Sequence, residues 1–296
     1  MVQVLAQYPV QYLQDQTYGL KTGDLVVFAC GSGTGKSTFS RLLTFSAIAQ
    51  GQPVALYSLE DRPGTFWKDY QRLMYIAETG NNMDFIAYEL ADSERPADFE
   101  KYRRASLAVK RSTNENGLPM LDLKEMNPDK AWDISELEKA IAIQVQLGYK
   151  LFIIDHLDVL GEESVAATQR IMDALWAMVV KHDIAIVAFS QLSKALPERV
   201  LCPGAEHLRG ANAKVLKSTL VVTMARDTYG YYALPGHPKA VANYMRIAKH
   251  RGKSNSAAIV YYENGNYLSG YREVMCNAPG TFIDGMTSEK IQKAIG

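Results

Sequence analysis

The sequence contains little cysteine and no excess of charge of either sign. Its three cysteines, Cys30, Cys202 and Cys276, are odd in number and widely spaced. This pattern excludes a disulfide framework and a cysteine-based metal motif, and it suggests a reducing compartment. The 32 basic and 32 acidic residues give a formal net charge of zero, so no global field attracts the chain to a polyanion. Any such binding must depend on local basic clusters.

Long hydrophobic runs are missing as well. No apolar run approaches the roughly 18 residues that can cross a bilayer, and residues Met1 to Gln16 lack the basic start of a secretion signal. We therefore expect a cytoplasmic protein with no membrane partner. What is present, 296 residues with 47% hydrophobic content, is a globular composition that could form one large α/β domain or two average ones.

Apolar, β-branched runs alternate with helical segments along the chain. The expected strands are Leu25–Cys30, Val54–Leu59, Leu118–Leu123, Leu151–Ile154, Ile184–Phe189 and Leu220–Ala225, and the expected helices are Ser37–Gln50, Pro63–Thr79, Ala97–Arg111, Ile134–Leu147 and Val165–Lys181. This alternation indicates a parallel sheet with helices on both faces. Two later runs, Ala242–Lys249 and Ser256–Tyr262, flank a polar turn and indicate an antiparallel hairpin. The fold class is therefore α/β, with a mostly parallel central sheet and C-terminal antiparallel strands.

A glycine-rich loop lies between the first expected strand and the first expected helix, the context that a phosphate-binding loop requires. Backbone N–H groups of such a loop converge on phosphate oxygens, Lys36 can reach the β- and γ-phosphates of ATP, and Ser37 can ligate Mg²⁺. Cys30 occupies the first position of the motif, where glycine is usual. The expected ATP-binding residues are Gly31, Ser32, Gly33, Thr34, Gly35, Lys36, Ser37 and Thr38.

Nucleotide hydrolysis also needs a carboxylate near the metal and a group that orients the attacking water. Asp155 ends an apolar strand, as a Walker B acid does, although an aspartate there could instead cap the next turn. The following residue is His156 and not the glutamate that many ring ATPases use as base. Glu60 ends another strand and is our candidate for polarising water, with a plain surface glutamate as the alternative. Gln191 follows a third strand, where its amide could contact the γ-phosphate.

Taken together, these motifs resemble those of the DnaB-like ring helicases of superfamily 4, and the helicase half of phage primase-helicases and mitochondrial Twinkle. The resemblance extends from about Thr17 to Gly270 and includes the following segments in order: Gly31–Ser37, Tyr57–Glu60, Leu151–Asp155, Phe189–Leu192, Leu208–Gly210 and Ile247–Arg251. It implies a RecA-like P-loop NTPase core, ATP sites between neighbouring subunits, and single-stranded DNA in a central channel.

The resemblance also assigns roles to individual residues. The catalytic groups it implies are Lys36, Glu60, Asp155, Gln191, Lys249 and Arg251, with Ser37 and Asp155 at the metal. Lys249 and Arg251 match a pair that family members insert into the neighbour's site, where a cation supplied in trans stabilises the transition state. Because alternate residues of a strand share a face, these two side chains can point together. The alternative for them is a solvated basic hairpin tip.

Basic residues gather where the resemblance places DNA. The loop after the Asp155 strand, Leu157–Ser164, contains only acidic charges and is a poor phosphate binder. The loop between Leu192 and Lys217 has more basic than acidic side chains. The chain therefore has a local basic cluster even though its net charge is zero. The expected DNA contacts are Lys194, Arg199, Arg209 and Lys214.

These observations predict an ATP-dependent DNA helicase or translocase that uses ATP and Mg²⁺ and acts on single-stranded DNA in replication. The expected organisation is a short N-terminal segment 1–16, a RecA-like core 17–270 and a C-terminal tail 271–296, which places no accessory domain ahead of the core. The expected partners are single-stranded DNA, further copies of the chain in a hexameric ring or a filament, and a primase or other replication protein. The alternative is a RecA-like DNA-dependent ATPase that binds DNA as a filament or clamp without unwinding it. A non-enzymatic module and an AAA+ loader fit these residues less well.

Overall fold

A computed structural model describes residues 2–31, 34–79, 85–126, 132–161, 164–192, 203–208, 210–226, 241–252, 258–263 and 273–276. Its strands are β1 (Val4–Ala6), β2 (Leu20–Lys21), β3 (Leu25–Cys30), β4 (Val54–Ser58), β5 (Leu121–Glu125), β6 (Leu151–Asp155), β7 (Ala185–Gln191), β8 (Leu220–Arg226), β9 (Val241–His250), β10 (Ala258–Glu263) and β11 (Glu273–Cys276). Its helices are α1 (Gln11–Thr17), α2 (Lys36–Ala49), α3 (Thr65–Thr79), α4 (Phe85–Glu94), α5 (Pro96–Arg111), α6 (Ile134–Leu147), α7 (Val165–His182) and α8 (Ala211–Lys217), with 3₁₀ turns η1 (Leu157–Val159) and η2 (Ala205–His207). None of these described helices is long and apolar enough to cross a membrane.

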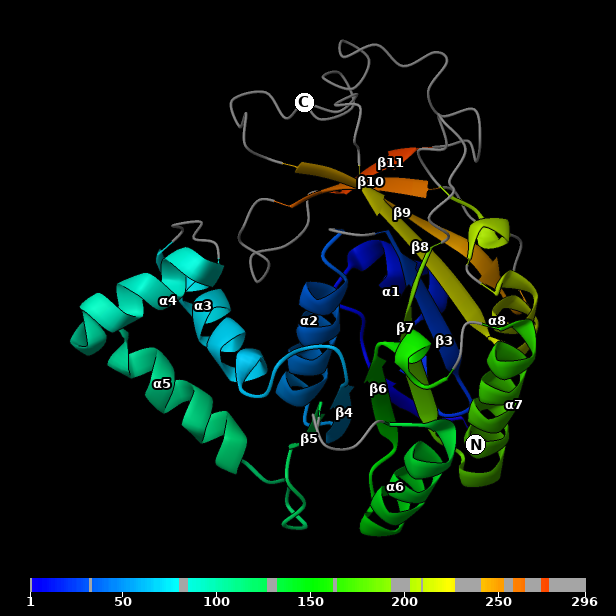
Figure 1. Cartoon of the computed structure of the whole chain (residues 1–296), viewed down its shortest axis with the longest axis horizontal. Coiled ribbons are helices and arrows are strands. Elements are labelled where there is room, and N and C mark those ends of the chain that lie inside the picture. The colour runs from blue at the N-terminus through cyan, green and yellow to red at the C-terminus, as the bar shows by residue number, and fades with distance from the viewer. Residues whose placement is uncertain are drawn as a thin grey trace.

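Nine of the described strands form a main sheet in the order β11-β10-β9-β8-β3-β7-β6-β4-β5, and β1 and β2 form a separate two-stranded sheet (Figure 1). Strands β8, β3, β7, β6, β4 and β5 run parallel, whereas β9, β10 and β11 pair antiparallel at one side of the sheet. The expected fold class is therefore confirmed: the continuous apolar runs form the parallel strands, and the predicted hairpin is β9 and β10.

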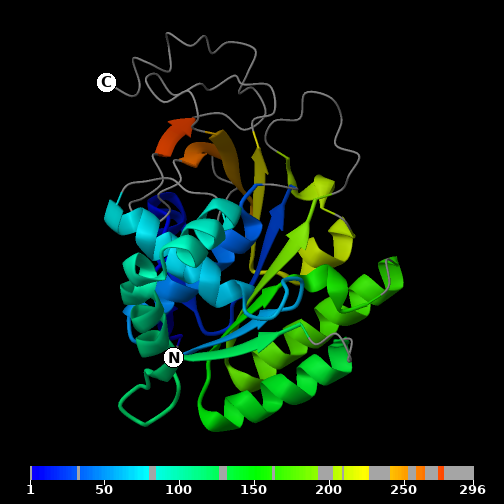
Figure 2. The ribbon, with the colours of Figure 1, turned by 60° about the vertical axis from the view of Figure 1, so that its left-hand side comes forward.

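Helices cover both faces of the sheet. As a result, every residue of β3 is buried. On one face Phe28 packs with Phe39 of α2 and stacks on Phe189 of β7, their ring centroids 5.2 Å apart. On the other face Val27 belongs to a cluster that includes Leu175 of α7. Figure 2 shows α6 and α7, in green, on the side of the sheet opposite the blue α2. This two-sided burial explains why the strands show no alternation of polar and apolar residues.

Strand register brings the sequence motifs to one edge of the sheet. Cys30 lies beside Gln191 in the β3–β7 pair, and Ser58 lies beside Asp155 in the β4–β6 pair. The phosphate loop, the segment after β4 and the ends of β6 and β7 therefore emerge together at the carboxyl edge of the parallel strands. This is the edge where open α/β sheets bind ligands.

Helices α3, α4 and α5 connect β4 to β5 and form an arm beside the sheet (Figure 1). The arm has a small aromatic core, in which Tyr75 stacks on Phe99 with centroids 5.4 Å apart and Tyr88 meets Phe99 edge to face. Helices α3 and α5 were expected from the sequence, but α4 was not. The apolar positions of α4 include exposed Ile86 and Leu90, so they do not form a clear buried stripe.

The chain before residue 17 packs into the main core. Strand β1 pairs with β2, and Leu5, Tyr8 and Leu13 are buried in the same cluster as Phe28. The expected boundary at residue 17 stays a prediction, but the first described residues are part of the fold and not a separate tail. Strand β11 falls within the predicted tail 271–296.

Candidate functional site

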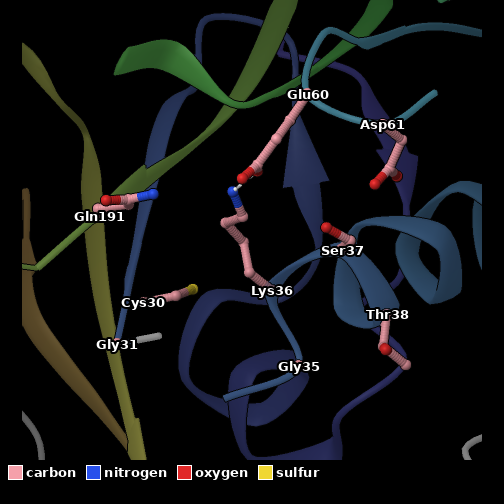
Figure 3. A pocket seen from close by; sticks show the side chains of 9 residues that line it. All are labelled: Cys30, Gly31, Gly35, Lys36, Ser37, Thr38, Glu60, Asp61 and Gln191. Carbon is pink, nitrogen blue, oxygen red and sulfur yellow. Dashed lines mark hydrogen bonds and ion pairs between the residues drawn. The ribbon is translucent and has the colours of Figure 1, made fainter. Parts of the chain in front are cut away.

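A pocket of about 320 Å³ opens at the carboxyl edge of the parallel strands. The residues that line it are Cys30, Gly31, Gly35, Lys36, Ser37, Thr38, Glu60, Asp61 and Gln191. In Figure 3 the side chains of Lys36 and Glu60 point toward one another across this pocket, with Ser37 and Asp61 to one side and Gln191 on the other. The structure thus brings together most of the residues predicted for nucleotide binding.

The phosphate loop is shaped by its backbone. Gly35 has a φ of +80°, a left-handed conformation that favours glycine, and α2 begins at the next residue. Thr34 is buried, and its hydroxyl donates to the carbonyl oxygen of Gly31 over 2.8 Å. The N-terminus of α2 therefore faces the pocket, where its free N–H groups favour an anion. Ser32 and Gly33 lie outside the described residues.

Lys36 contacts both candidate acids of the site. Its Nζ lies 2.5 Å from Glu60 Oε2 and 3.6 Å from Asp155 Oδ1. Burial opposes ionisation of Glu60, but the hydrogen bond and charge of Lys36 outweigh it and lower the pKa of this carboxyl. Glu60 is therefore a carboxylate at neutral pH, as a group that polarises water must be.

Asp155 is buried behind Lys36 at the end of β6. Burial raises the pKa of this carboxyl, and the Lys36 and Arg41 cations oppose the rise. Its Oδ1 atom is buried and accepts no hydrogen bond from the described residues. An unsatisfied carboxylate oxygen of this kind fits an Mg²⁺ ion or a water bound to it. The described residues hold no cluster of three or more His, Cys, Asp or Glu side chains that could hold a metal ion by themselves.

His156, for which the sequence indicated no role, lies directly beside Glu60. Its Nε2 is 3.3 Å from Glu60 Oε2, and its Nδ1 accepts the backbone N–H of Asp158 over 3.2 Å. Burial, and then the charge of Lys36, lower the pKa of this imidazole. In the sequence, the position of His156 directly after an acid that ends a strand indicates that it lies near the site. Spacing alone does not show which way its ring points.

Asp158 lies behind the pocket and accepts bonds from three directions. Its carboxylate accepts the backbone N–H of Gln191 over 2.8 Å and the Ser190 hydroxyl over 3.0 Å, and it pairs with Lys214 Nζ at 2.6 Å. Burial would raise the pKa of Asp158, but the Lys214 ammonium and the Gln191 N–H outweigh it and lower that pKa. The Gln191 side chain lines the nucleotide pocket while its backbone is held by Asp158.

Lys249 and Arg251 lie at the opposite edge of the sheet from the pocket. In the β8–β9 pair His250 lies beside Leu220, and the N–H of Arg251 donates to Thr219, whose own N–H donates to Leu25 at the start of β3. The phosphate loop begins after the other end of β3, about 17 Å away at the usual rise per strand residue. Neither side chain lines the pocket of its own chain.

The two cations contact different helices of their own chain, Lys249 at α8 and Arg251 at α7. Lys249 Nζ donates to the carbonyl oxygens of Val215 and Leu216 at the end of α8, and the Arg251 guanidinium lies over the Trp176 ring of α7 at 4.8 Å from its centroid. The expected joint role of the two side chains in a neighbour's site stays a prediction.

Comparison with known proteins assigns the family. The model of the DnaB-like helicase C terminal domain matches residues 7–267. The chain belongs to the DnaB-like helicase family. A comparison with curated proteins finds no match. Among solved structures, one ATPase domain is 18% identical with a TM-score of 0.70, and the match covers 93% of each chain. A structure of a DnaB-like replicative helicase and its interactions with primase is 19% identical with a TM-score of 0.69, covering 94% of this chain and 63% of that one.

This DnaB-like chain is therefore a helicase motor with a RecA-like core and is an ATP-hydrolysing enzyme. The resemblance stated from the motifs is confirmed, and nothing in the comparisons supports the filament or clamp alternative. The roles of individual residues stay predictions, since the comparisons concern the domain as a whole.

One expected DNA contact of this helicase lies elsewhere than predicted. Lys214 was expected on a channel-facing loop, but it lies on α8 with only 2% of its surface exposed and is bound to Asp158 and Ser190. The structure corrects that placement, because the short helix turns this side chain inward. Lys194, Arg199 and Arg209 lie outside the described residues and stay predictions.

Proposed function

We propose that the chain is the motor subunit of a hexameric ring that hydrolyses ATP·Mg²⁺ at subunit interfaces and moves on single-stranded DNA. In each subunit Gly31 to Thr38 bind the nucleotide, Glu60 polarises the attacking water and Gln191 contacts the γ-phosphate. Ser37 and Asp155 hold Mg²⁺, which neutralises phosphate charge when bound. The neighbouring subunit supplies Lys249 and Arg251. The motor core corresponds to residues 17–270 in this proposal.

The separation of the two cations from their own pocket carries the proposal. A pocket with Lys36, Glu60 and Asp155 contains a phosphate-binding cation and two acids, but phosphoryl transfer also benefits from a cation that neutralises charge in the transition state. Lys249 and Arg251 are suited to that role and lie at the far edge of the sheet. A head-to-tail assembly would bring this edge of one copy to the pocket of the next, and such an assembly closes into a ring when its rotation permits.

For the DNA, we propose that the segment after β7, with Lys194 and Arg199, and Arg209 before α8 contact the phosphates of the strand. A contact that neutralises backbone charge makes affinity fall with salt. A primase or another replication protein is the proposed partner, supported by the primase named with one structural relative.

Strand displacement on a forked duplex tests this function. The chain should separate the strands in the presence of ATP and Mg²⁺, and its mass should increase to that of a hexamer when ATP is added. Lys36→Ala, which removes the phosphate-binding cation, is the matched control and should displace no strand. DNA-stimulated hydrolysis without displacement would contradict the motor role on this substrate and favour a clamp.

A further inference from the structure

An ion pair between a buried lysine and a mostly buried aspartate, the Asp158 side chain being 13% exposed, lies next to Gln191 of the nucleotide pocket. Lys214 Nζ of α8 is 2.6 Å from Asp158 Oδ1 and 2.6 Å from Ser190 Oγ, and Lys214 has 2% of its surface exposed. Taking two charges out of water costs several kcal/mol per ion, and an apolar pair of similar volume is often at least as stable. A gain in stability therefore does not account for a charged pair at this position. The groups that the pair orients give a better reason for its presence.

Asp158 is the point at which two parts of the hydrolysis site meet. Its carboxylate accepts the backbone N–H of Gln191 over 2.8 Å, at the end of the strand that carries the γ-phosphate-contacting side chain. Its own backbone N–H donates to His156 Nδ1 over 3.2 Å. A shift of Asp158 would therefore move both the Gln191 backbone and the His156 ring.

His156 links Asp158 to Glu60 through its two ring nitrogens. Because Nδ1 accepts a hydrogen bond, the proton of a neutral ring lies on Nε2. That nitrogen is 3.3 Å from Glu60 Oε2 and can donate to it. Lys36 holds the same carboxylate oxygen at 2.5 Å in this structure but has to reach the phosphates when ATP binds. The His156 contact can then keep Glu60 oriented toward water.

We propose that Lys214 is a positioning residue for ATP hydrolysis, which holds Asp158 so that the Gln191 backbone and the Glu60 carboxylate keep their catalytic geometry. The same helix carries the Val215 and Leu216 carbonyls that Lys249 contacts. Helix α8 thus connects the cation offered to a neighbouring site with the acid of its own site. The proposal rests on the hydrolysis site described above, and its connection to Lys249 rests on the proposed ring.

The test compares Lys214→Met, Asp158→Asn and the double variant with the wild-type chain. Melting temperature, kcat, KM for ATP and the Kd of a fluorescent ATP analogue are measured for each. We expect both single variants to lower the melting temperature, because each leaves one buried charge without its partner. We expect kcat to fall about 10- to 100-fold in Lys214→Met, since small displacements of catalytic groups cost this much. The Kd should change less than about threefold, because phosphate contacts remain.

The double variant separates positioning from structural support. It removes both charges, so its melting temperature should return near the wild-type value, while kcat should stay at least about tenfold low because residue 158 no longer has the Lys214 contact that fixes its position. Recovery of kcat together with the melting temperature would overturn the proposal. So would a double variant that does not fold, since the pair would then be a structural requirement.

A second ion pair made by a lysine of α8, this time with α7, is the matched control. Lys217 Nζ of α8 lies 2.6 Å from Asp173 Oδ1 of α7, with both side chains more than a third exposed. Lys217→Met should leave kcat within about twofold of wild type, as exposed pairs contribute little. An equal loss of kcat in Lys217→Met would overturn the proposal, because any change in α8 would then have this effect. If the wild-type chain hydrolyses no ATP, both the proposed function and the positioning role of Lys214 are overturned. If the wild-type chain is active and Lys214→Met has the same kcat, only the positioning role is overturned.

Discussion

Glu60 is shared between two donors in this structure, the Lys36 ammonium at 2.5 Å and the His156 ring at 3.3 Å. The Lys36 contact neutralises both groups. In the function proposed above, ATP exchanges this ion pair for one between Lys36 and phosphate, which frees a Glu60 oxygen for water. The lowered pKa of Glu60 keeps it ionised for that task.

At this scale we predict that Glu60→Gln binds ATP and Mg²⁺ with unchanged or higher affinity but hydrolyses ATP about 10²- to 10⁴-fold more slowly, because the amide cannot accept a proton from water. Single-turnover rates and nucleotide titration measure the two effects separately. Asp61→Asn is the control: Asp61 lines the same pocket but faces Arg41 at 2.5 Å, so its loss should leave most of the rate. Near-normal turnover in Glu60→Gln would mean that another group is the base.

Between elements, a buried charge cluster ties the phosphate-loop helix α2 to the arm. Arg41 of α2 contacts Asp69 of α3 at 2.5 Å and Asp61 at 2.5 Å, and Arg72 contacts Asp69 at 2.7 Å. Both arginines and Asp69 are buried. The cluster therefore fixes the start of the arm relative to the nucleotide site.

We predict that Asp69→Asn lowers the free energy of unfolding by about 3–5 kcal/mol, because it leaves buried Arg41 and Arg72 with less compensating charge. Urea denaturation of the chain measures this loss. Glu89→Gln removes the partner of Lys68 in a more exposed pair on the same arm and should cost at most about 1 kcal/mol. Equal, small effects of both substitutions would show that the buried cluster does not stabilise the junction.

Among the elements, those with long and regular patterns were predictable. The six apolar strands and the helices α2, α3, α5, α6 and α7 follow from continuous burial and helical periodicity. Helix α8 was missed because seven residues contain too few turns for a clear period, and the segment was expected as a loop. Strand β5 begins at Leu121 and not at Leu118, since Thr113 and Pro119 form a bridge at the preceding turn.

For the whole molecule, we propose that Lys249 and Arg251 complete sites between copies. We predict that Lys36→Ala and Arg251→Ala each lose at least about 10³-fold in kcat, but that mixing them restores activity. In a random one-to-one ring roughly one quarter of interfaces combine an intact Lys36 with an intact Arg251. Steady-state hydrolysis at a series of mixing ratios measures the recovery.

Lys36→Ala mixed with Glu60→Gln is the control for this experiment. Lys36 and Glu60 lie in one pocket, so every interface of that mixture has one of the two defects and no activity should return. Recovery of ATP hydrolysis in both mixtures would mean that the recovered activity does not depend on a neighbour's Arg251. No recovery with Arg251→Ala would contradict its action in trans.

The sequence by itself determined the parallel core, the phosphate loop and the order of the motifs, because each depends on residues close together in the chain. The tertiary structure decided how distant segments meet. It placed His156 between Glu60 and Asp158, turned Lys214 inward, and set Lys249 and Arg251 at the sheet edge opposite the pocket. These arrangements depend on strand register and on which face of a short helix is buried, and a linear pattern of residue types does not specify either.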